Sequence, residues 1–320
     1  RAKAGPRRTV SLVLGSGGAR GHAHLGVIRA LEEQGLEIRN LAGTSMGAVI
    51  DGIHAAGALD TYMEWACMLE VGDVVKLLDF SFRGGVFKGE RVFDVLGELI
   101  GHRRIEQLDT GFTAVATDLE SGAEIRLRRG SLRMAVKASS SIPGMVPAKR
   151  IDERDLVDGG VVAEVPVAAA REVGRPVLAV DASMQTPPPG EDDFALDTMM
   201  RTQLMTSRLL RERQLADATW VIRPEIGHVA WADWGAFDEM IAAAEKVREN
   251  LTLYFTVDTL ENLMRGGRIG RAQAMVGSAL QIKPSLYIDP ETGEVAPGEK
   301  VRTRKKALKR IYIDFFKTVP

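Results

Sequence analysis

Residues 41–50, Leu-Ala-Gly-Thr-Ser-Met-Gly-Ala-Val-Ile, contain the pentapeptide Gly43-Thr44-Ser45-Met46-Gly47 with the spacing G-x-S-x-G. An apolar segment precedes the pentapeptide and a long stretch of small apolar residues, 48–69, follows it, so the sequence predicts a strand, a sharp turn and a helix. The glycines two positions before and after the serine, Gly43 and Gly47, let strand and helix pass closely. Ser45 is therefore a candidate nucleophile at a helix N-terminus, where free N–H groups favour developing negative charge, and an ordinary structural turn is the alternative.

A second glycine-rich turn lies upstream. Residues 9–14 predict a buried strand, which stops at the turn 15–21, and residues 22–33 show the apolar spacing of a helix. A second strand is predicted over 38–42. In such a β-turn-α-β unit both turns lie at the same end of a parallel sheet, which is the end where open α/β sheets bind ligands.

The glycine-rich turn has three interpretations. A dinucleotide-binding fingerprint requires G-x-G-x-x-G, but the sixth residue from Gly15 is Arg20, and no carboxylate ends the next strand. A P-loop requires a Gly-Lys-Ser/Thr ending, which is missing. The third interpretation is an oxyanion hole, in which the N–H groups of Gly17, Gly18 and the next residues point at one oxygen, and a nucleophile on the adjacent turn favours it.

Residues 135–160 are the second informative region. The run Ser139-Ser140-Ser141, followed by two prolines, predicts an ordered loop and not a helix. A short strand then ends in Asp158-Gly159-Gly160. The aspartate is either a turn-forming residue or, combined with Ser45, a catalytic base.

The remaining elements complete an α/β pattern. We expect a hairpin or strand pair over 112–127, strands over 177–182 and 220–224, and helices over 198–215 and 237–251. The helix over 198–215 is expected to carry a basic outer face formed by Arg201, Arg208 and Arg211. The Pro-rich acidic segment 186–193 is predicted to be a mobile loop. The aromatic segment 74–87 forms either a mobile apolar lid over a lipid-binding cleft or an ordinary loop and helix.

We predict two regions, a catalytic domain over residues 1–251 and a less regular extension over 252–320. The extension includes a polar, turn-rich stretch at 289–300. Its final segment, 303–320, has one apolar helical stripe surrounded by lysines and arginines. This helix either docks on its own domain or on a second subunit of a homodimer, or it lies on an anionic membrane surface.

Composition narrows the class of protein. The chain has 320 residues, 45% hydrophobic and 27% charged, as in soluble globular proteins, and its net charge of −1 argues against a nucleic-acid binder. The single cysteine, Cys67, is expected to be a buried structural thiol, which fits a reducing compartment. The sequence has no run of 18 apolar residues and no signal-peptide apolar region at its start. We therefore expect a cytoplasmic protein, with contact at the inner membrane face as an option, and the missing initiator Met leaves upstream trimming open.

The three motifs at 17–21, 43–47 and 158–160 occur in the order and spacing of the patatin-like phospholipases. The sequence resembles most closely the bacterial branch related to neuropathy target esterase. Further segments that resemble this branch are 140–144, 116–118, 216–217 and 222–224, so the resemblance covers residues 10–248. Ser16 departs from the family's commonest glycine loop, G-x-G-x-x-G, but it still offers a backbone N–H.

The resemblance implies a three-layer α/β/α sandwich with a mostly parallel central sheet. It also implies a serine lipid acyl hydrolase that needs no metal, calcium or other cofactor. Ser45 would be the nucleophile and Asp158 its base, in a Ser-Asp dyad that works through an acyl-enzyme. The implied oxyanion donors are the N–H groups of Gly17, Gly18 and Arg20, and the implied supporting residues are Gly43, Gly47, Gly159 and Gly160.

Phospholipids or lysophospholipids are the substrates that this resemblance implies, and the Arg20 side chain is a candidate to steer an anionic head group. Because a free aspartate, with a pKa of about 3.9, is a weak base, burial beside the elbow must raise the pKa of Asp158. A Ser-Asp-His triad is the alternative, since His228 is the only histidine after Asp158. However, an α/β-hydrolase has several strands before its nucleophile, and here only one fits before the elbow strand.

Two more histidines, His22 and His24, lie on the first predicted helix. They are candidates to lie near the site, and the alternative is that they lie in solvent or in core packing. The function itself has two competing interpretations. An acyltransferase or thioesterase would use the same nucleophile as the hydrolase. A catalytically silent lipid-binding module would keep only the scaffold.

Overall fold

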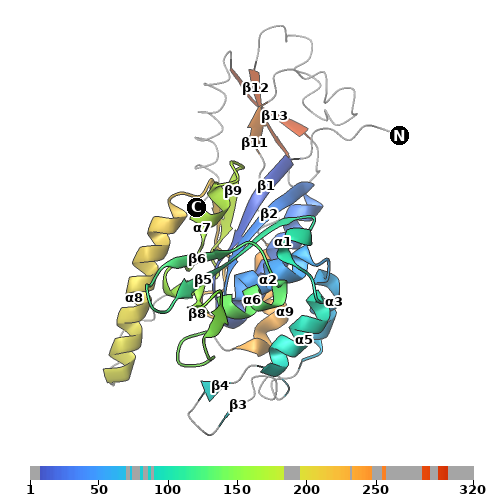
Figure 1. The fold of residues 1–320 in the computed structure, drawn as a ribbon. Coiled ribbons are helices and arrows are strands. Elements are labelled where there is room, and N and C mark those ends of the chain that lie inside the picture. The colour runs from blue at the N-terminus through green and yellow to red at the C-terminus, as the bar shows by residue number, and fades with distance from the viewer. Residues whose placement is uncertain are drawn as a thin grey trace. The chain divides into compact units, whose positions relative to one another are not determined.

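The computed structural model describes residues 8–69, 73, 80–81, 86–87, 90–183, 195–230, 233–246, 254–256, 283–288 and 295–301 (Figure 1). The chain divides into two compact units. One consists of Arg8–Ala244, and the other of Arg1–Arg7 with Glu245–Pro320. The larger unit holds every residue of the predicted active site.

A central sheet runs through the larger unit in the strand order β10-β9-β1-β2-β5-β8-β7, with β6 beside β5. The five strands from β10 to β5 are mutually parallel, whereas β6, β7 and β8 join by antiparallel pairing. The strands are β1 (Arg8–Leu14), β2 (Leu36–Thr44), β5 (Gly111–Asp118), β6 (Glu124–Leu127), β7 (Lys149–Ile151), β8 (Arg154–Asp158), β9 (Val177–Val180) and β10 (Trp220–Ile222). The predicted mostly parallel sheet is confirmed.

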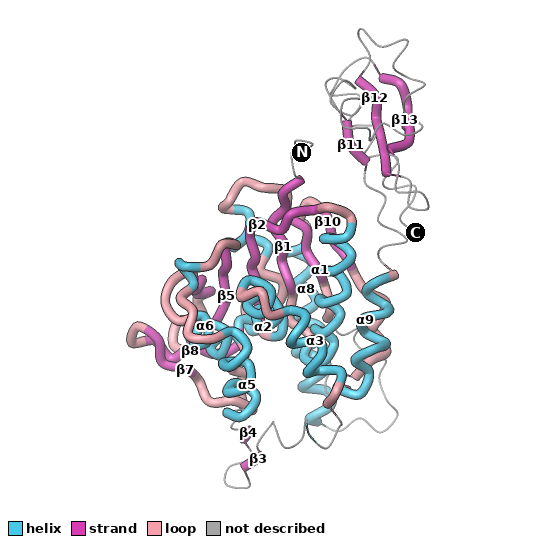
Figure 2. Tube along the Cα trace, turned by 90° about the vertical axis from the view of Figure 1, so that its right-hand side faces the viewer, coloured by secondary structure: helices cyan, strands magenta, loops and turns pink. Residues whose placement is uncertain are grey.

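Helices cover both faces of this sheet. The described helices are α1 (Ala23–Glu33), α2 (Met46–Ala55), α3 (Leu59–Cys67), α5 (Glu90–Ile100), α6 (Leu132–Ser139), α7 (Val167–Arg171), α8 (Ala195–Leu215) and α9 (Phe237–Glu245), with the short 3-10 helices η1 (Gly18–His22), η2 (Ile105–Gln107), η3 (Gly159–Val161) and η4 (Trp234–Ala236). In Figure 1, α7 and α8 lie on one side of the sheet, and α1, α2 and α6 lie on the other. Figure 2 looks onto the side that α1, α2 and α6 cover. This is the expected three-layer α/β/α arrangement.

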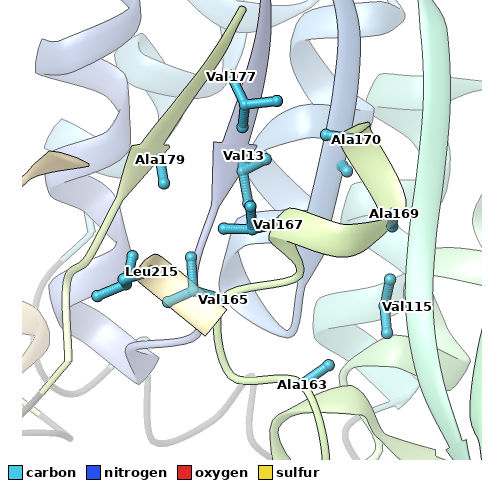
Figure 3. Close-up of a cluster of buried hydrophobic side chains, with 11 residues drawn as sticks. Val13, Val115, Ala163, Val165, Val167, Ala169, Ala170, Val177, Ala179 and Leu215 are labelled. Carbon is cyan, nitrogen blue, oxygen red and sulfur yellow. The ribbon is translucent and has the colours of Figure 1, made fainter. Parts of the chain in front are cut away.

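Small and β-branched side chains, with Leu215 of α8 as the one larger member, fill the space between the sheet and α7 (Figure 3). Such side chains let a short helix approach a sheet closely, and they pack well on a pleated surface. The buried members of this cluster are Val13, Ala42, Val115, Ala163, Val165, Val167, Ala169, Ala170, Val177, Ala179 and Leu215. Because β1, β2 and β5 all contribute to the cluster, it fixes the relative positions of the two strands whose ends carry the glycine-rich and serine turns and of the strand that pairs with β8.

Strand register brings the three sequence motifs to one end of the sheet. Leu14 of β1 pairs with Gly43 of β2 in parallel, so the glycine-rich turn and the serine turn follow at the same edge, as predicted. Thr44 of β2 pairs with Val115 of β5. The next residue of β5, Ala116, pairs with Asp158 of the antiparallel strand β8. The ladder alone therefore places Asp158 beside the turn that carries Ser45.

Several expectations about helices are wrong. The predicted helix over 48–69 is two helices, because Gly57 between α2 and α3 adopts a positive φ of 69° that ends the first of them. Cys67 is exposed, not buried. It lies at the end of α3, whose buried face carries Tyr62, Met63 and Ala66, and a step of one residue turns a side chain by about 100° away from that face.

Two further expectations fail because tertiary contacts decide the outcome. Ser139 is the last residue of α6 and Ser140 is its C-cap, so the serine run begins inside a helix and not in a loop. Arg211 of α8 is buried, because it forms ion pairs with Glu164 and Asp181. It therefore does not belong to a basic outer face.

The smaller unit contains a three-stranded antiparallel sheet of β11 (Tyr254–Thr256), β12 (Lys283–Ile288) and β13 (Val295–Val301). The stretch 289–300, expected to be turn-rich, thus ends in a strand. The predicted loop 186–193 and helix 303–320 lie outside the described residues. So does most of the candidate lid 74–87, where only the paired strands β3 (Phe80–Ser81) and β4 (Val86–Phe87) are described. Among the helices that are described, none is long and apolar enough to cross a bilayer.

Candidate active site

Ser45 lies on a sharp turn between β2 and α2, with φ 55° and ψ −125°. This conformation is rare for a residue with a Cβ and stores roughly 1–3 kcal/mol of strain. The flanking glycines are required by space. A Cβ on Gly47 would lie 2.1 Å from the carbonyl oxygen of Leu14, and one on Gly43 would lie 2.5 Å from the amide nitrogen of Ala48. The predicted strand-turn-helix at Ser45 is therefore present.

Asp158 meets Ser45 although 113 residues separate them in the chain. The Ser45 hydroxyl donates a hydrogen bond of 2.5 Å to Oδ2 of Asp158. The other carboxylate oxygen, Oδ1, accepts the Gly160 N–H at 2.7 Å. A Cβ on Gly159 would lie 2.2 Å from the carbonyl oxygen of Val115, so only glycine allows β5 and this turn to pack so closely. The hydrogen bond from Gly160 and the close packing of Gly159 against β5 thus set the direction of the carboxylate.

Burial raises the pKa of Asp158 from 3.8 to about 6, and hydrogen bonds from Ser45 and Gly160 oppose the rise. Nearby Glu164 adds a smaller increase through charge repulsion. The side chain is buried together with Ser45. At neutral pH the carboxyl group is therefore ionised, and it is a stronger base than an exposed aspartate.

The glycine-rich turn is tied to neighbouring segments through its backbone. The Gly15 N–H donates to the Val180 oxygen at 3.0 Å, and the Ser16 N–H to the Glu164 oxygen at 2.9 Å. Gly18 has a φ of 58°, which glycine adopts at little cost. Among the described residues, the N–H groups of Gly17 and Gly18 meet no acceptor. These two groups are thus free to bind an oxygen of a ligand.

Arg20 is the third residue of η1. In a 3-10 helix this is the first residue whose N–H bonds within the helix, so the Arg20 N–H is less available to a ligand than those of Gly17 and Gly18. Its side chain is buried and donates to two backbone oxygens, that of Ala182 at 3.1 Å and that of Val229 at 3.2 Å. The expectation that this side chain steers a head group is therefore wrong. Instead, it fixes η1 to the segments that follow β9 and β10.

His22 and His24 are buried and also hold the glycine-rich turn. His22 Nδ1 lies 2.8 Å from the Ala19 oxygen, and His24 Nε2 lies 2.8 Å from the Gly15 oxygen. Because a carbonyl oxygen only accepts, each of these ring nitrogens carries the proton. Burial lowers the pKa of each histidine to about 4, so both are neutral at physiological pH. Both histidines are therefore packed in the core and not in solvent, and they lie against the glycine-rich turn of the candidate site.

His228, the candidate third member of a triad, lies on the surface, where its Nε2 pairs with Glu239 at 2.5 Å. Asp158 already contacts Ser45 directly, so a histidine has no place between them. We expect His228→Ala to leave kcat/KM for ester hydrolysis within about twofold of wild type, since surface changes of this kind have small effects. Steady-state hydrolysis of a soluble ester checks this. A loss of more than tenfold without a change in Tm would restore the triad.

Sequence reasoning missed the buried charges beneath the glycine-rich turn. Arg211 donates to Glu164 at 2.9 Å, and Asp181 accepts from Arg223 at 3.3 Å. The backbone oxygen of Glu164 in turn holds Ser16. The partners lie 42 or more residues apart, so no local pattern could have paired them. A buried charge needs a partner, so Arg211 and Glu164 hold each other in place. Because Glu164 also binds Ser16, this ion pair supports the glycine-rich turn.

The model of the family described as "Patatin-like phospholipase" matches residues 12–171. The chain belongs to the patatin-like phospholipase family. The matched segment holds Ser45, Asp158 and the glycine-rich turn, and the predicted family is confirmed. A second model, described as "Uncharacterised protein, DegV family", matches residues 229–319. The two matches do not overlap, so the patatin-like and DegV-like segments follow one another in this chain.

Curated relatives support the predicted branch, because several are named NTE family proteins. An uncharacterized NTE family protein of Mycobacterium tuberculosis is 43% identical over 185 residues, covering 58% of this chain and 49% of that protein. Another NTE family protein from the same species is 38% identical, and the match covers 50% of this chain and 27% of that protein. Patatin-like phospholipase domain-containing protein 6 of Mus musculus is 33% identical, covering 55% and 14%. This chain spans about half the length, or less, of these relatives.

Among solved structures, VipD from Legionella pneumophila is similar to this chain with a TM-score of 0.36 and 14% identity. The likeness covers 76% of this chain and 67% of VipD. A DegV family protein from Thermus thermophilus has a TM-score of 0.23 and 20% identity, covering 66% and 70%.

Proposed function

We propose that this protein is a serine lipid acyl hydrolase in which Ser45 is the nucleophile and Asp158 the general base. The observation that carries the proposal is the 2.5 Å hydrogen bond from the Ser45 hydroxyl to Oδ2 of Asp158, on a strained turn beside a glycine-rich loop. A serine hydroxyl becomes an effective nucleophile when an adjacent base takes its proton. No further side chain is needed to connect the two groups.

In the first half of the reaction, Ser45 Oγ attacks the ester carbonyl carbon while its proton moves to Asp158. The negative charge that forms on the carbonyl oxygen is bound by the N–H groups of Gly17 and Gly18. When the tetrahedral intermediate collapses, the ester C–O bond breaks. The leaving alcohol or lysolipid takes the proton from Asp158, and the acyl group stays on Ser45.

In the second half, water replaces the alcohol. Asp158 takes one proton from this water, and the resulting hydroxide attacks the acyl carbon. Collapse of the second intermediate breaks the bond to Ser45 Oγ, which regains the proton from Asp158. A fatty acid is released and the enzyme returns to its starting state.

The proposed substrates are phospholipids or lysophospholipids. Membership of a family named for phospholipases supports this class, and so does the name of the Mus musculus relative, a patatin-like phospholipase domain-containing protein. The sequence-based interpretations of a homodimer, of a cytoplasmic location and of membrane contact through residues 303–320 stay predictions.

The direct test combines covalent labelling with product analysis. We expect a fluorophosphonate probe to label the wild-type chain but not Ser45→Ala. Mass spectrometry should show fatty acid and lysolipid from phospholipid vesicles with wild type and not with Asp158→Ala. Transfer of the acyl group to an added alcohol in preference to water would change the assignment to an acyltransferase. Labelling that persists in Ser45→Ala would contradict the proposed nucleophile.

The pH dependence of hydrolysis should report the pKa of Asp158. This carboxyl group must be deprotonated to act as a base, and burial raises its pKa to about 6. We therefore expect kcat/KM to fall about tenfold per pH unit below pH 6 and to level off above it. The measurement uses an uncharged ester, with Tm recorded at each pH to exclude unfolding. An acid limb centred near the ordinary value of about 4 would contradict a buried base.

A further inference from the structure

Three consecutive serines at the end of α6 contact both members of the proposed dyad. Ser139 is fully buried, and its hydroxyl bonds in two directions. It accepts the Ser45 N–H at 3.1 Å and donates to the Val115 oxygen at 2.6 Å. Ser139 therefore links the peptide group before the nucleophile to strand β5.

The next two serines complete the contacts. The Ser140 hydroxyl donates to the Ser45 carbonyl oxygen at 3.2 Å. The carbonyl oxygen of Ser141 accepts the Asp158 N–H at 2.8 Å, and the Ser141 hydroxyl donates to the Lys137 oxygen at 2.8 Å. One short segment thus bonds to the backbone of the nucleophile at two points and to that of the base at a third.

These bonds meet a specific physical need at Ser45. Its φ of 55° and ψ of −125° are strained, and such a conformation persists only where surrounding contacts over-determine it. Ser139 holds the N–H on one side of the Ser45 Cα atom, and Ser140 holds the C=O on the other side. Together the two hydroxyls oppose rotation about both backbone dihedrals. Without them, the peptide groups at the turn could relax, and Ser45 Oγ would move relative to Asp158.

We propose that Ser139–Ser141 is a positioning segment, which keeps the strained nucleophile turn in register with the base. The inference rests on the proposed hydrolase function and deepens it, because it assigns the alignment of the two reacting side chains to a third part of the chain. Ser139 and Ser140 act through Ser45 and touch no substrate in this role. Their hydroxyl groups, and the carbonyl oxygen of Ser141, are the parts that matter.

The test compares serines at the two ends of α6. Ser131 caps the N-terminus of this helix, where its hydroxyl accepts the Met134 N–H. Ser131→Ala should lower Tm and leave kcat unchanged. Ser139→Ala should lower kcat on the order of 100-fold with KM within about twofold, as expected for a small misplacement of reacting groups. The rate of fluorophosphonate labelling should fall in parallel.

Ser140 gives a second, milder variant pair, because its side chain is only partly buried. Ser140→Ala should lower kcat about tenfold, and Ser140→Thr, which keeps the hydroxyl, should retain it. If Ser139→Ala fails to fold, this pair decides the question. Full kcat in both alanine variants of an active enzyme would overturn the positioning role alone. A wild-type protein that neither hydrolyses esters nor reacts with the probe would overturn the proposed function as well.

Discussion

Asp158→Asn should abolish hydrolysis and at the same time stabilise the folded protein at pH 8. We expect kcat to fall on the order of 10,000-fold, the upper end of what a positioned general base contributes. Asparagine has nearly the shape of aspartate, so its side-chain oxygen can still accept from Gly160 and its NH₂ can donate to Ser45. It cannot take up the proton of the attacking hydroxyl. The loss is therefore chemical and not structural.

The stability change follows from the raised pKa of Asp158, which is 3.8 for the free group and about 6 in the folded protein. Below pH 3.8 the group is protonated in both states, and its ionisation does not affect folding. As the pH rises through 6, the folded protein must hold a buried charge, which destabilises it by about 3 kcal/mol at pH 8. A neutral amide avoids this cost. We therefore expect Tm of Asp158→Asn to exceed that of wild type at pH 8, with the difference shrinking towards pH 4.

The matched control is Asp155→Asn on the same strand, β8. Asp155 is exposed and pairs with Arg150 at 3.4 Å, so its replacement should leave kcat unchanged and shift the free energy of unfolding by less than about 1 kcal/mol. Thermal melts at pH 4, 6 and 8 with parallel ester assays separate the two variants. Retained hydrolysis in Asp158→Asn would exclude Asp158 as the base. A Tm below that of wild type at pH 8 would show that the carboxylate is better stabilised than its burial indicates.

The nucleophile turn could be predicted from sequence because its requirements are local. One residue must adopt a strained conformation, and the residues two before and two after it must lack a Cβ, so five consecutive positions carry the whole pattern. The position of the glycine-rich turn followed in the same way, since parallel strands joined through a helix place their C-terminal ends together.

The contact between Ser45 and Asp158 could not be derived locally. It depends on β8 pairing antiparallel with β5, at a register in which Ala116 faces Asp158. The hydrophobic pattern of a five-residue strand fixes neither its partner nor its direction. From the sequence, only the resemblance to a family predicts that Ser45 and Asp158 form a pair.

Side-chain directions were the other source of error. A sequence shows that Arg20 follows the glycines, but it cannot show that the guanidinium turns inward to Ala182 and Val229. The prediction that Cys67 is buried is wrong for a related reason. Adjacent positions on an amphipathic helix can face opposite environments, one the core and the other solvent. The serine run with the prolines after it predicts a loop, yet α6 continues to Ser139, where tertiary hydrogen bonds use the hydroxyl.

Of the glycine-to-alanine substitutions in the catalytic region, Gly47→Ala is expected to destabilise the folded protein most. The added Cβ would lie 2.1 Å from the Leu14 oxygen and 2.7 Å from the Gly15 oxygen. Both are backbone atoms, at the point where β1 enters the glycine-rich turn, so relief requires α2 and the turn to move apart. We expect a loss of about 3 kcal/mol in the free energy of unfolding. For the folded fraction of Gly47→Ala, kcat should fall on the order of 100-fold, because the nucleophile moves away from the oxyanion donors.

Gly97→Ala, in the middle of α5, provides the comparison. Its Cβ would also meet atoms at 2.8 Å, but these belong to the guanidinium of Arg133, a flexible side chain that can swing aside. Alanine is favoured over glycine in a helix interior by roughly 0.5–1 kcal/mol, and displacing the exposed Arg133 pair with Asp94 offsets part of this gain. Urea unfolding should therefore show near-wild-type stability for Gly97→Ala and a large loss for Gly47→Ala. Equal stability of the two variants would mean that β1 and α2 are not held together at Gly47, and the close approach of the two turns would then have to be abandoned.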